Sequence, residues 1–302
     1  MPTVSVLITT FEGLRFLPGA IASVLSQRDV ELECIVVDDA STDGTGAFLE
    51  GLDDRRLVVL RNEVNLGPFA SANRGLERAR GAFMARLDAD DVCRPDRLAQ
   101  QVAFLERHPA VGLVGSECER IDEHGRVMGH QPVPEGDLAI RLRALVASPF
   151  IHSTVVWRSS LGLRYDGTLR LAGDYELWTR ALEQTRVANL PVPLVQYRVW
   201  PQSLSAKQGE QQRELHDEFA ARTCARQWPA LGIDASTVRQ LRAWCALGQP
   251  APMPPAARRL VEALRHAVLG ASPSDAALDS FARALFSAPG AYGQPAPAAA
   301  PT

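Results

Sequence analysis

A cluster of carboxylates interrupts an apolar stretch of the chain at residues 83–98, FMARLDADDVCRPDRL. Asp88, Asp90 and Asp91 follow the apolar run directly, and Arg86 precedes them. Neighbouring carboxylates repel each other and raise each other's pKa, and a cation relieves that repulsion. Mg²⁺ and Mn²⁺ bind hard oxygen ligands, typically one or two carboxylates together with substrate phosphates. This spacing therefore suits an ion that also binds a diphosphate.

A simpler interpretation is that these acids only favour the start of the next helix. Asp96 lies inside the first turn predicted there and fits that role. An isolated Asp-x-Asp also occurs often by chance. The strand before the acids, the helix after them and a second strand that ends in acids together favour a functional site.

The elements around the acids follow a regular pattern. The first hundred residues alternate apolar, β-branched stretches with stretches whose apolar residues recur at helical spacing. This alternation predicts an α/β fold, in which a mostly parallel sheet is flanked by helices on both faces. Strands are predicted over residues 4–10, 31–39, 56–62 and 82–88, and helices over 17–25, 42–52, 67–81 and 94–109.

Polar side chains follow three of these predicted strands. Thr9 and Thr10 end the first strand, Asp38 and Asp39 end the second, and the acids of 88–91 end the fourth. In open parallel α/β sheets, ligands bind beyond the carboxyl ends of the strands. We therefore expect these side chains to meet at one ligand site.

A further candidate is Asp174, in the stretch RLAGDYELW. It comes at the start of a predicted helix, directly after Gly173. An acid at this position is a common N-cap, and it could equally serve as a general base. The periodicity alone leaves both roles open.

The second half of the chain follows a different pattern. Two strands about a turn at 124–125 are followed by mixed elements and then, from about Lys207, by helices only. The predicted elements are strands within 112–129, a helix over 137–147, a strand over 152–160, a helix over 174–184, extended segments over 186–190 and 192–200, and helices over 210–228, 235–247, 255–269 and 274–286.

Composition excludes several classes of protein. The 302 residues carry a formal net charge of -3, which does not indicate a general nucleic-acid or anionic-membrane binder. The five cysteines are scattered without a Cys-x-x-Cys pair, which argues against a disulfide framework or a structural zinc site. No secretory signal pattern and no apolar stretch of ~20 residues is present. We therefore expect a cytoplasmic protein, with peripheral contact at the inner face of a membrane left open.

Four stretches of the chain together resemble family 2 glycosyltransferases in their order and spacing. They are VSVLITTFEG, IVVDDASTDGT, NLGPFASANRGLERARGAFMARLDADDVCRPDRL and GDYELWTRAL, and the resemblance extends from residue 3 to about residue 205. It implies a GT-A, Rossmann-like fold that uses a nucleotide-diphospho-sugar donor. With the helical pattern, it predicts a GT-A domain over 1–206, a C-terminal helical extension over 207–287 and a disordered tail over 288–302.

The resemblance also implies roles for single residues. Thr9 and Asp39 would contact the nucleobase, Asp88 would bind the ribose or help hold a metal ion, and Asp90 would be the direct ligand of Mn²⁺ or Mg²⁺. The ion would bridge the two phosphates and neutralise charge on the leaving nucleoside diphosphate. Asp174 would be the single base that deprotonates the acceptor hydroxyl, which implies inversion at the anomeric carbon.

The chain departs from the family pattern at four positions. Gly173 stands where the family usually has Glu before the catalytic Asp, and Phe11 and Glu12 stand in place of Tyr-Asn. Trp200 replaces a His that some members offer to the metal or phosphate. Near it, Arg198 could pair with a phosphate, and Trp200 could shield the site or simply pack in the core. His152 would line the acceptor side or serve as a structural histidine.

These observations lead to a main interpretation and two alternatives. The main one is a metal-dependent inverting hexosyltransferase that uses a nucleotide sugar, with UDP the expected nucleotide. The resemblance alone implies the acceptor, a glycan or lipid-linked acceptor in bacterial surface polysaccharide synthesis. The alternatives are a GT-A-like nucleotidyltransferase, which usually has a Gly-rich basic loop that is missing here, and a binding module without catalysis. A dinucleotide-binding oxidoreductase is disfavoured because no G-x-G-x-x-G follows the first strand.

The C-terminal helices leave several partners open. Arg258, Arg259 and Arg265 lie on the amphipathic helix predicted over 255–269. They could touch an anionic membrane surface or form a solvated helix face. The same region could form a homodimer contact or a lid on the acceptor site. No nucleic-acid partner is expected.

Overall fold

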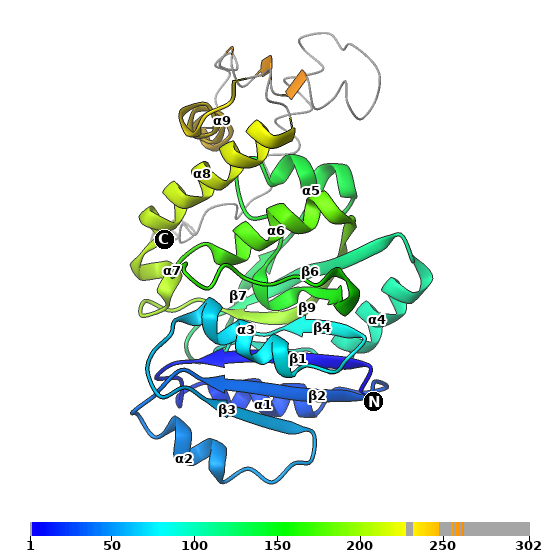
Figure 1. Cartoon of the computed structure of the whole chain (residues 1–302), viewed down its shortest axis with the longest axis vertical. Coiled ribbons are helices and arrows are strands. Elements are labelled where there is room, and N and C mark those ends of the chain that lie inside the picture. The colour runs from blue at the N-terminus through cyan, green and yellow to red at the C-terminus, as the bar shows by residue number, and fades with distance from the viewer. Residues whose placement is uncertain (1, 228–231, 248–254, 256–257, 260, 263–302) are drawn as a thin grey trace, which may run out of the picture. The chain divides into compact units, whose positions relative to one another are not determined.

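The structure is a computed structural model that describes residues 2–227, 232–247, 255, 258–259 and 261–262 (Figure 1). The chain divides into two compact units. The first contains residues up to Arg141 together with Ser148–Val199, and the second contains Leu142–Ala147 together with the described residues from Trp200 onward. The predicted site residues, apart from Trp200, belong to the first unit.

Four parallel strands form one side of the sheet in the first unit, in the order β3-β2-β1-β4. β2 is buried at every position, as expected for a strand covered on both faces. These strands confirm the four predicted from the apolar runs. They are β1 (Val4–Thr10), β2 (Leu32–Asp38), β3 (Leu57–Arg61) and β4 (Phe83–Arg86).

The sheet continues beyond β4 with mixed pairing, and among the described residues it has nine strands. The order continues β4-β8-β6-β9-β5, with β7 paired to β6. Pairing is antiparallel except between β6 and β9, which run parallel along most of their length. The added strands are β5 (Val92–Cys93), β6 (Val111–Ile121), β7 (Val127–Gln131), β8 (Val156–Arg158) and β9 (Arg186–Arg198).

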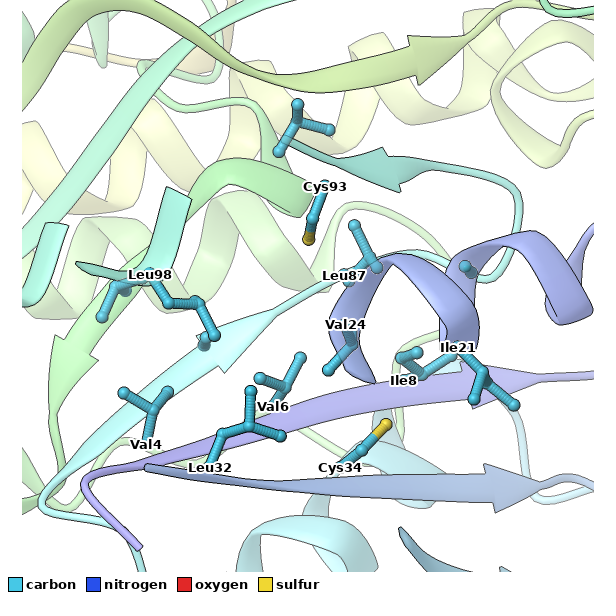
Figure 2. Close-up of a cluster of buried hydrophobic side chains, with 14 of the residues drawn as sticks. Val4, Val6, Ile8, Ile21, Val24, Leu32, Cys34, Leu87, Cys93 and Leu98 are labelled. Atoms are coloured by element: carbon cyan, nitrogen blue, oxygen red, sulfur yellow. The ribbon is translucent and has the colours of Figure 1, made fainter. Parts of the chain in front are cut away.

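Helices cover both faces of the parallel strands, which confirms the predicted fold class. On one face, Val4, Val6 and Ile8 of β1 pack with Ile21 and Val24 of α1 (Figure 2). Side chains alternate along a strand, and the next residue in β1, Leu7, contacts α3 on the other face instead. The helices of this unit are α1 (Leu17–Leu25), α2 (Thr45–Glu50), α3 (Pro68–Arg78), α4 (Arg97–Arg107) and α6 (Gly173–Gln184); α5 (Asp137–Arg143) ends in the second unit.

The strand predicted over 152–160 is wrong in its extent. Only β8 is extended there, and a 3₁₀ turn lies on each side of it, over His152–Thr154 and Ser159–Leu161. The hydroxyl of Thr154 donates to the backbone oxygen of Ile151 at 2.8 Å, a local bond that competes with the ladder. The first turn places His152 and Ser153 next to the end of β4.

Other predicted boundaries also change, and the helices predicted over 42–52 and 137–147 are shorter, as Thr45–Glu50 and Asp137–Arg143. The helix predicted from residue 94 begins at Arg97, because β5 pairs with β9 just before it. The extended segments predicted over 186–190 and 192–200 form one strand, β9.

Helices make up most of the described second unit. They are α7 (Leu204–Lys207), α8 (Gly209–Gln227) and α9 (Ala235–Leu247), and the last two match the predicted helices closely. Asp217 of α8 is buried and pairs with Arg242 of α9 at 2.6 Å, which joins the two helices. No helix in the described ranges combines the length and apolar character that crossing a bilayer requires.

Much of the predicted C-terminal structure lies outside the described residues. This holds for the helix over 274–286, the tail over 288–302 and all but five residues of the helix over 255–269.

Candidate functional site

The acidic loop lies where β4 ends, at the carboxyl edge of the parallel strands. Asp91 is buried, and its Oδ1 accepts a hydrogen bond from the backbone N–H of Arg198 at 2.7 Å. Its Oδ2 has no hydrogen-bond partner within the described residues. Burial and the charges of Asp90 and Asp88 raise the pKa of Asp91 well above its ordinary value. Like charges are therefore held together in this loop at an energetic cost.

Asp88 lies next to the side chains of Arg86 and His152. Its Oδ1 is 3.2 Å from Nη2 of Arg86 and 3.2 Å from Nδ1 of His152. Its backbone N–H donates to Oγ of Ser153 at 3.0 Å. Burial would raise the pKa of Asp88, but His152 and Arg86 hold that pKa well below its ordinary range. Asp88 is therefore ionised, and its contacts hold the carboxylate in one orientation.

The buried guanidinium of Arg86 joins the ends of β1 and β4. It donates from Nη2 to Oγ1 of Thr9 at 2.6 Å and from Nη1 to the backbone oxygen of Leu7 at 2.8 Å. Its Nε lies 3.3 Å from Nε2 of His152. A guanidinium can only donate, so Nε2 accepts this bond, and Nδ1 on the other side of the ring faces Asp88. The predicted residues Thr9, Asp88 and His152 thus belong to one network.

Arg198 holds the acidic loop from the end of β9. Its Nε donates to the backbone oxygen of Asp90 at 2.8 Å, and its Nη1 donates to that of Asp122 at 2.8 Å. The guanidinium carbon lies 4.5 Å from the centre of the Phe16 ring. Two of its nitrogens are therefore committed to the protein backbone rather than to a phosphate.

The acidic loop fits a divalent ion that is shared with a diphosphate. No group of three His, Cys, Asp or Glu side chains among the described residues forms a metal cage. A diphosphate-bridging Mg²⁺ needs only one or two carboxylates from the protein. The unpaired buried oxygen of Asp91 and the half-buried side chain of Asp90 offer the hard oxygen donors that such an ion prefers.

Asp39 lies at the end of β2, and its carboxylate is already bound to the protein. Its Oδ1 accepts from Nδ2 of Asn62 at 2.6 Å and from the N–H of Leu66 at 2.8 Å. Its Oδ2 accepts from the N–H of Gly67 at 2.8 Å. Asp39 therefore fixes the loop that leads into α3. A carboxylate has about four acceptor positions, which leaves room for one more donor.

Asp174 is not an N-cap, so the structural alternative for this residue is wrong. The helix α6 begins at Gly173, its N-cap is Ala172, and no side chain caps it. Asp174 is half-buried in the first turn, and it makes no hydrogen bond or ion pair within the part of the chain that the structure describes. A carboxylate in this state is available to accept a proton.

Tyr165 links Asp174 to the network around Asp88. Its hydroxyl is 2.9 Å from Nε2 of His152. Burial raises the pKa of Tyr165, the charge of Arg86 lowers it, and the charges of Asp88 and Asp174 raise it. Both carboxylates thus act electrostatically on one hydroxyl.

Sequence reasoning missed Tyr165, Ser153 and Asn73. Asn73 lies inside a helix, where an amide is unfavourable unless its side chain has a specific partner, and that was the available signal. Tyr165 and Ser153 gave no comparable signal. The predicted place of Trp200 stays a prediction, because that residue belongs to the second unit.

Comparison with known proteins fits this arrangement. The sequence model of the family described as glycosyl transferase family 2 matches residues 5–159. The chain belongs to this family. The match spans β1 to β8 and therefore includes the acidic loop.

Several relatives of this family 2 protein are glycosyltransferases by name. An uncharacterised glycosyltransferase of Haemophilus influenzae is 27% identical over 256 residues, covering 80% of this chain and 79% of the relative. The putative glycosyltransferase EpsE of Bacillus subtilis is 36% identical over 195 residues, covering 61% and 68%. The succinoglycan biosynthesis protein ExoO of Rhizobium meliloti is 32% identical over 201 residues, covering 60% and 56%.

Solved structures confirm the GT-A fold of this family 2 protein. Residues 1–349 of S. aureus TarS superpose with a TM-score of 0.60 at 18% identity, covering 94% of this chain and 88% of that one. TarS in complex with UDP gives a TM-score of 0.56 at 20% identity, covering 94% and 90%.

Proposed function

We propose that the chain transfers a sugar, with inversion, from a UDP-sugar to a hydroxyl of a glycan or lipid-linked acceptor. The observation that carries this proposal is the state of Asp174. Its carboxylate has no hydrogen-bond partner in the described chain, and its charge, like that of Asp88, raises the pKa of the Tyr165 hydroxyl. Family membership supports the reaction class.

The donor is bound at the carboxyl ends of β1, β2 and β4. Thr9 and Asp39 face the nucleobase, and Asp39 uses its remaining acceptor position for the imide N–H. Asp88 binds the ribose or helps to hold the cation. The names of two TarS structures, solved with UDP and with UDP-GlcNAc, support a uridine nucleotide.

The acidic loop provides the ligands of a divalent cation, with Asp90 as the direct ligand and Asp88 as a second. Mn²⁺ or Mg²⁺ bound there would neutralise charge that develops on the leaving diphosphate. Arg198 keeps the backbone of Asp90 in place. The raised pKa of the buried Asp91 supports this role, because an added positive charge stabilises three crowded carboxylates.

Asp174 is the general base. Its carboxylate takes the proton of the acceptor hydroxyl while that oxygen forms a bond to the anomeric carbon of the donor. The bond from that carbon to the diphosphate oxygen breaks, and its electron pair leaves with UDP. Attack opposite the leaving group inverts the anomeric centre.

The names of several relatives support a role in bacterial polysaccharide synthesis. ExoO is a succinoglycan biosynthesis protein, and AmsE of Erwinia amylovora, 35% identical over 158 residues, is an amylovoran biosynthesis glycosyltransferase. We place the reaction in the cytoplasm, at the inner face of the membrane where lipid-linked acceptors are accessible.

A nucleotide-sugar panel tests the proposal. UDP-glucose, UDP-galactose, UDP-N-acetylglucosamine and GDP-mannose are added with MnCl₂, and thermal stabilisation and nucleotide release are measured. At least one UDP-sugar should stabilise the protein and release UDP, and EDTA should abolish both effects. Stabilisation by none of the four, or equal UDP binding in EDTA, would contradict the proposal.

Asp174→Asn tests the base separately. Nucleotide release should fall by about 10²–10⁴-fold, the usual contribution of a general base, while UDP binding measured by calorimetry stays within about two-fold. Asp166→Asn is the matched control, because Asp166 is an exposed carboxylate in the segment just before α6. An active Asp174→Asn variant would remove Asp174 as the base.

A further inference from the structure

One face of α3 carries the segment that leads to Asp174. Phe69 and Asn73 are four residues apart and therefore share that face. The side-chain amide of Asn73 holds Tyr165 by two bonds: Nδ2 donates to the backbone oxygen of Tyr165 at 2.8 Å, and Oδ1 accepts from its backbone N–H at 2.9 Å. The amide thus bonds both the N–H and the C=O of Tyr165, as the backbone of a neighbouring strand would.

The ring of Phe69 holds the same segment at two points. It stacks on the ring of Tyr165, with centroids 5.4 Å apart and planes at 23°. It also fills the space next to Gly173, where a Cβ would lie only 2.6 Å from Cδ2 and Cε2 of the ring. The ring is 7% exposed and cannot swing into solvent. Gly173 is therefore glycine because Phe69 occupies the place of a side chain.

The N-terminal end of α3 is anchored at the nucleotide end of the proposed site. The N–H groups of Leu66 and Gly67, the last residues before the helix, both donate to the carboxylate of Asp39. One short helix thus connects Asp39 with the segment that carries Asp174.

The backbone just before Asp174 leaves little freedom. Ala172 has φ 56°, a left-handed conformation that is unfavourable for a residue with a Cβ. The contacts of Tyr165 and Gly173 with α3 maintain this conformation, and they therefore set the direction in which α6 begins.

We propose that Phe69 and Asn73 are positioning residues, which fix the carboxylate of Asp174 relative to the network around Asp88. This inference rests on the proposed role of Asp174 as the base. Neither residue touches the reacting atoms. Their effect is on geometry, where a misplacement of about 1 Å in the reacting groups lowers a rate by about 10²-fold.

A pair of substitutions tests the shared space. Gly173→Ala places a methyl group against the Phe69 ring, and Phe69→Ala removes the ring. Gly173→Ala should lower UDP release by about 10–100-fold from whichever of the panel's UDP-sugars the wild-type protein hydrolyses fastest. Phe69→Ala alone should also lower it, because the segment loses the ring that holds it, and the double variant should be no worse than the more impaired single variant, since both substitutions act on the same contact. UDP affinity should stay within about two-fold throughout. A fully active Gly173→Ala or Phe69→Ala variant, or a double variant whose loss is the product of the two single losses, would overturn the inference.

Asn73→Asp provides a second variant with nearly unchanged shape. The aspartate keeps an oxygen that accepts from the N–H of Tyr165. Its other carboxylate oxygen faces the backbone oxygen of Tyr165, to which Nδ2 of Asn73 donates in the wild-type protein. The rate constant for UDP release should fall while the KM for the donor stays the same. Glu77→Gln, an exposed exchange of acid and amide on the same helix, should leave both unchanged. A shift in KM alone would indicate a role in donor binding and would overturn the inference.

Hydrogen exchange separates this inference from the proposed function. In Asn73→Asp, backbone amides of residues 165–176 should exchange at least ten-fold faster than in the wild-type protein, while those of β1 stay protected. If Asp174→Asn proves fully active, the base assignment fails, whereas the exchange result still measures the hold of α3 on this segment. Unchanged exchange across 165–176 would overturn the positioning role whatever the enzyme activity.

Discussion

The acidic loop illustrates how single residues can be predicted from type and spacing. Acids at strand ends and helix starts mark Asp88, Asp90 and Asp174 as candidates, and the family resemblance implies their roles; in the structure the charges of Asp88 and Asp174 both raise the pKa of Tyr165. Their partners were not predictable in the same way. Tyr165 and Asn73 are 92 residues apart in sequence, and no local pattern encodes the bond between them.

Asp90→Ala tests the direct metal ligand. The variant should bind UDP with the same affinity in MnCl₂ and in EDTA, because the cation loses its main contact with the protein. Calorimetry with UDP measures both affinities. Asp96→Ala serves as the control, since Asp96 lies in the next turn of chain and its carboxylate accepts only from Gln100 in the described structure. A variant that keeps a strong manganese dependence would assign the ion to other residues.

Arg198→Lys tests whether the guanidinium of Arg198 holds the acidic loop in place. A lysine has no fork of nitrogens and cannot bind the backbone oxygens of Asp90 and Asp122 together. The manganese concentration needed for half-maximal UDP binding should rise by about 10-fold or more, as for the loss of an outer-shell partner of a metal site.

Arg15→Gln is the matched control for Arg198→Lys. Arg15 also lies over the ring of Phe16, at 4.7 Å, and it pairs with Glu123. It should leave the manganese requirement unchanged. If both substitutions act alike, the effect arises from the Phe16 ring and not from the loop.

Helices and strands were predictable wherever a long apolar pattern was not interrupted by local side-chain bonds. The parallel strands β1 to β4 have that pattern, and α9 was placed at its observed ends. The prediction failed over 152–160, where the hydroxyl of Thr154 bonds to the chain and breaks the strand. That break puts His152 beside Asp88, so the least regular segment contributes directly to the site.

The helix α4 positions the end of β4 through a fully buried arginine. Nη2 of Arg97 donates to the backbone oxygen of Arg86 at 2.9 Å, and its Nε donates to Oε1 of Gln101 at 3.0 Å. Arg97→Met should lower the free energy of unfolding by about 3 kcal/mol, because buried acceptors lose their donors. Urea unfolding measures the change.

The exposed Arg107, in the last turn of the same helix, supplies the control. Arg107→Met should change the free energy of unfolding by less than about 0.5 kcal/mol. Equal effects of the two substitutions would show that the helix, and not the buried guanidinium, is responsible.

At the scale of the whole molecule, a buried carboxylate near the amino ends of the parallel strands stabilises the fold. Glu33 accepts from Oγ of Ser5 at 2.6 Å and from Nη2 of Arg80 at 2.7 Å. Burial opposes its charge, but the bonds from Ser5 and Arg80 lower the pKa of Glu33 overall. This acid therefore stabilises the native state only while it is ionised.

The pH dependence of stability follows from the lowered pKa of Glu33. With the pKa of Glu33 lower in the folded than in the unfolded chain, its contribution is present above the unfolded value of about 4.3 and is lost as pH falls through the folded value. Glu33→Gln should lower the free energy of unfolding by about 2 kcal/mol at pH 7, and by less at pH 3. Urea midpoints at the two pH values measure this difference.

The exposed Glu50 gives the comparison for Glu33. Glu50→Gln should leave the midpoints at both pH values unchanged. A constant deficit of Glu33→Gln at both pH values would mean that packing, and not ionisation, stabilises this end of the sheet.

The interlocking of Phe69 with Gly173 restricts the evolutionary history of the chain. The family resemblance implies glutamate at this position, and a Cβ at 173 would lie 2.6 Å from two atoms of the ring in its present position. We therefore expect the glycine to have arisen before the phenylalanine, because the reverse order passes through a clashing pair. With both present, a substitution at 173 alone would recreate the clash. Homologues should accordingly have an aromatic ring at position 69 only where position 173 is glycine. Homologues with glycine at 173 and no ring at 69 would represent the intermediate step.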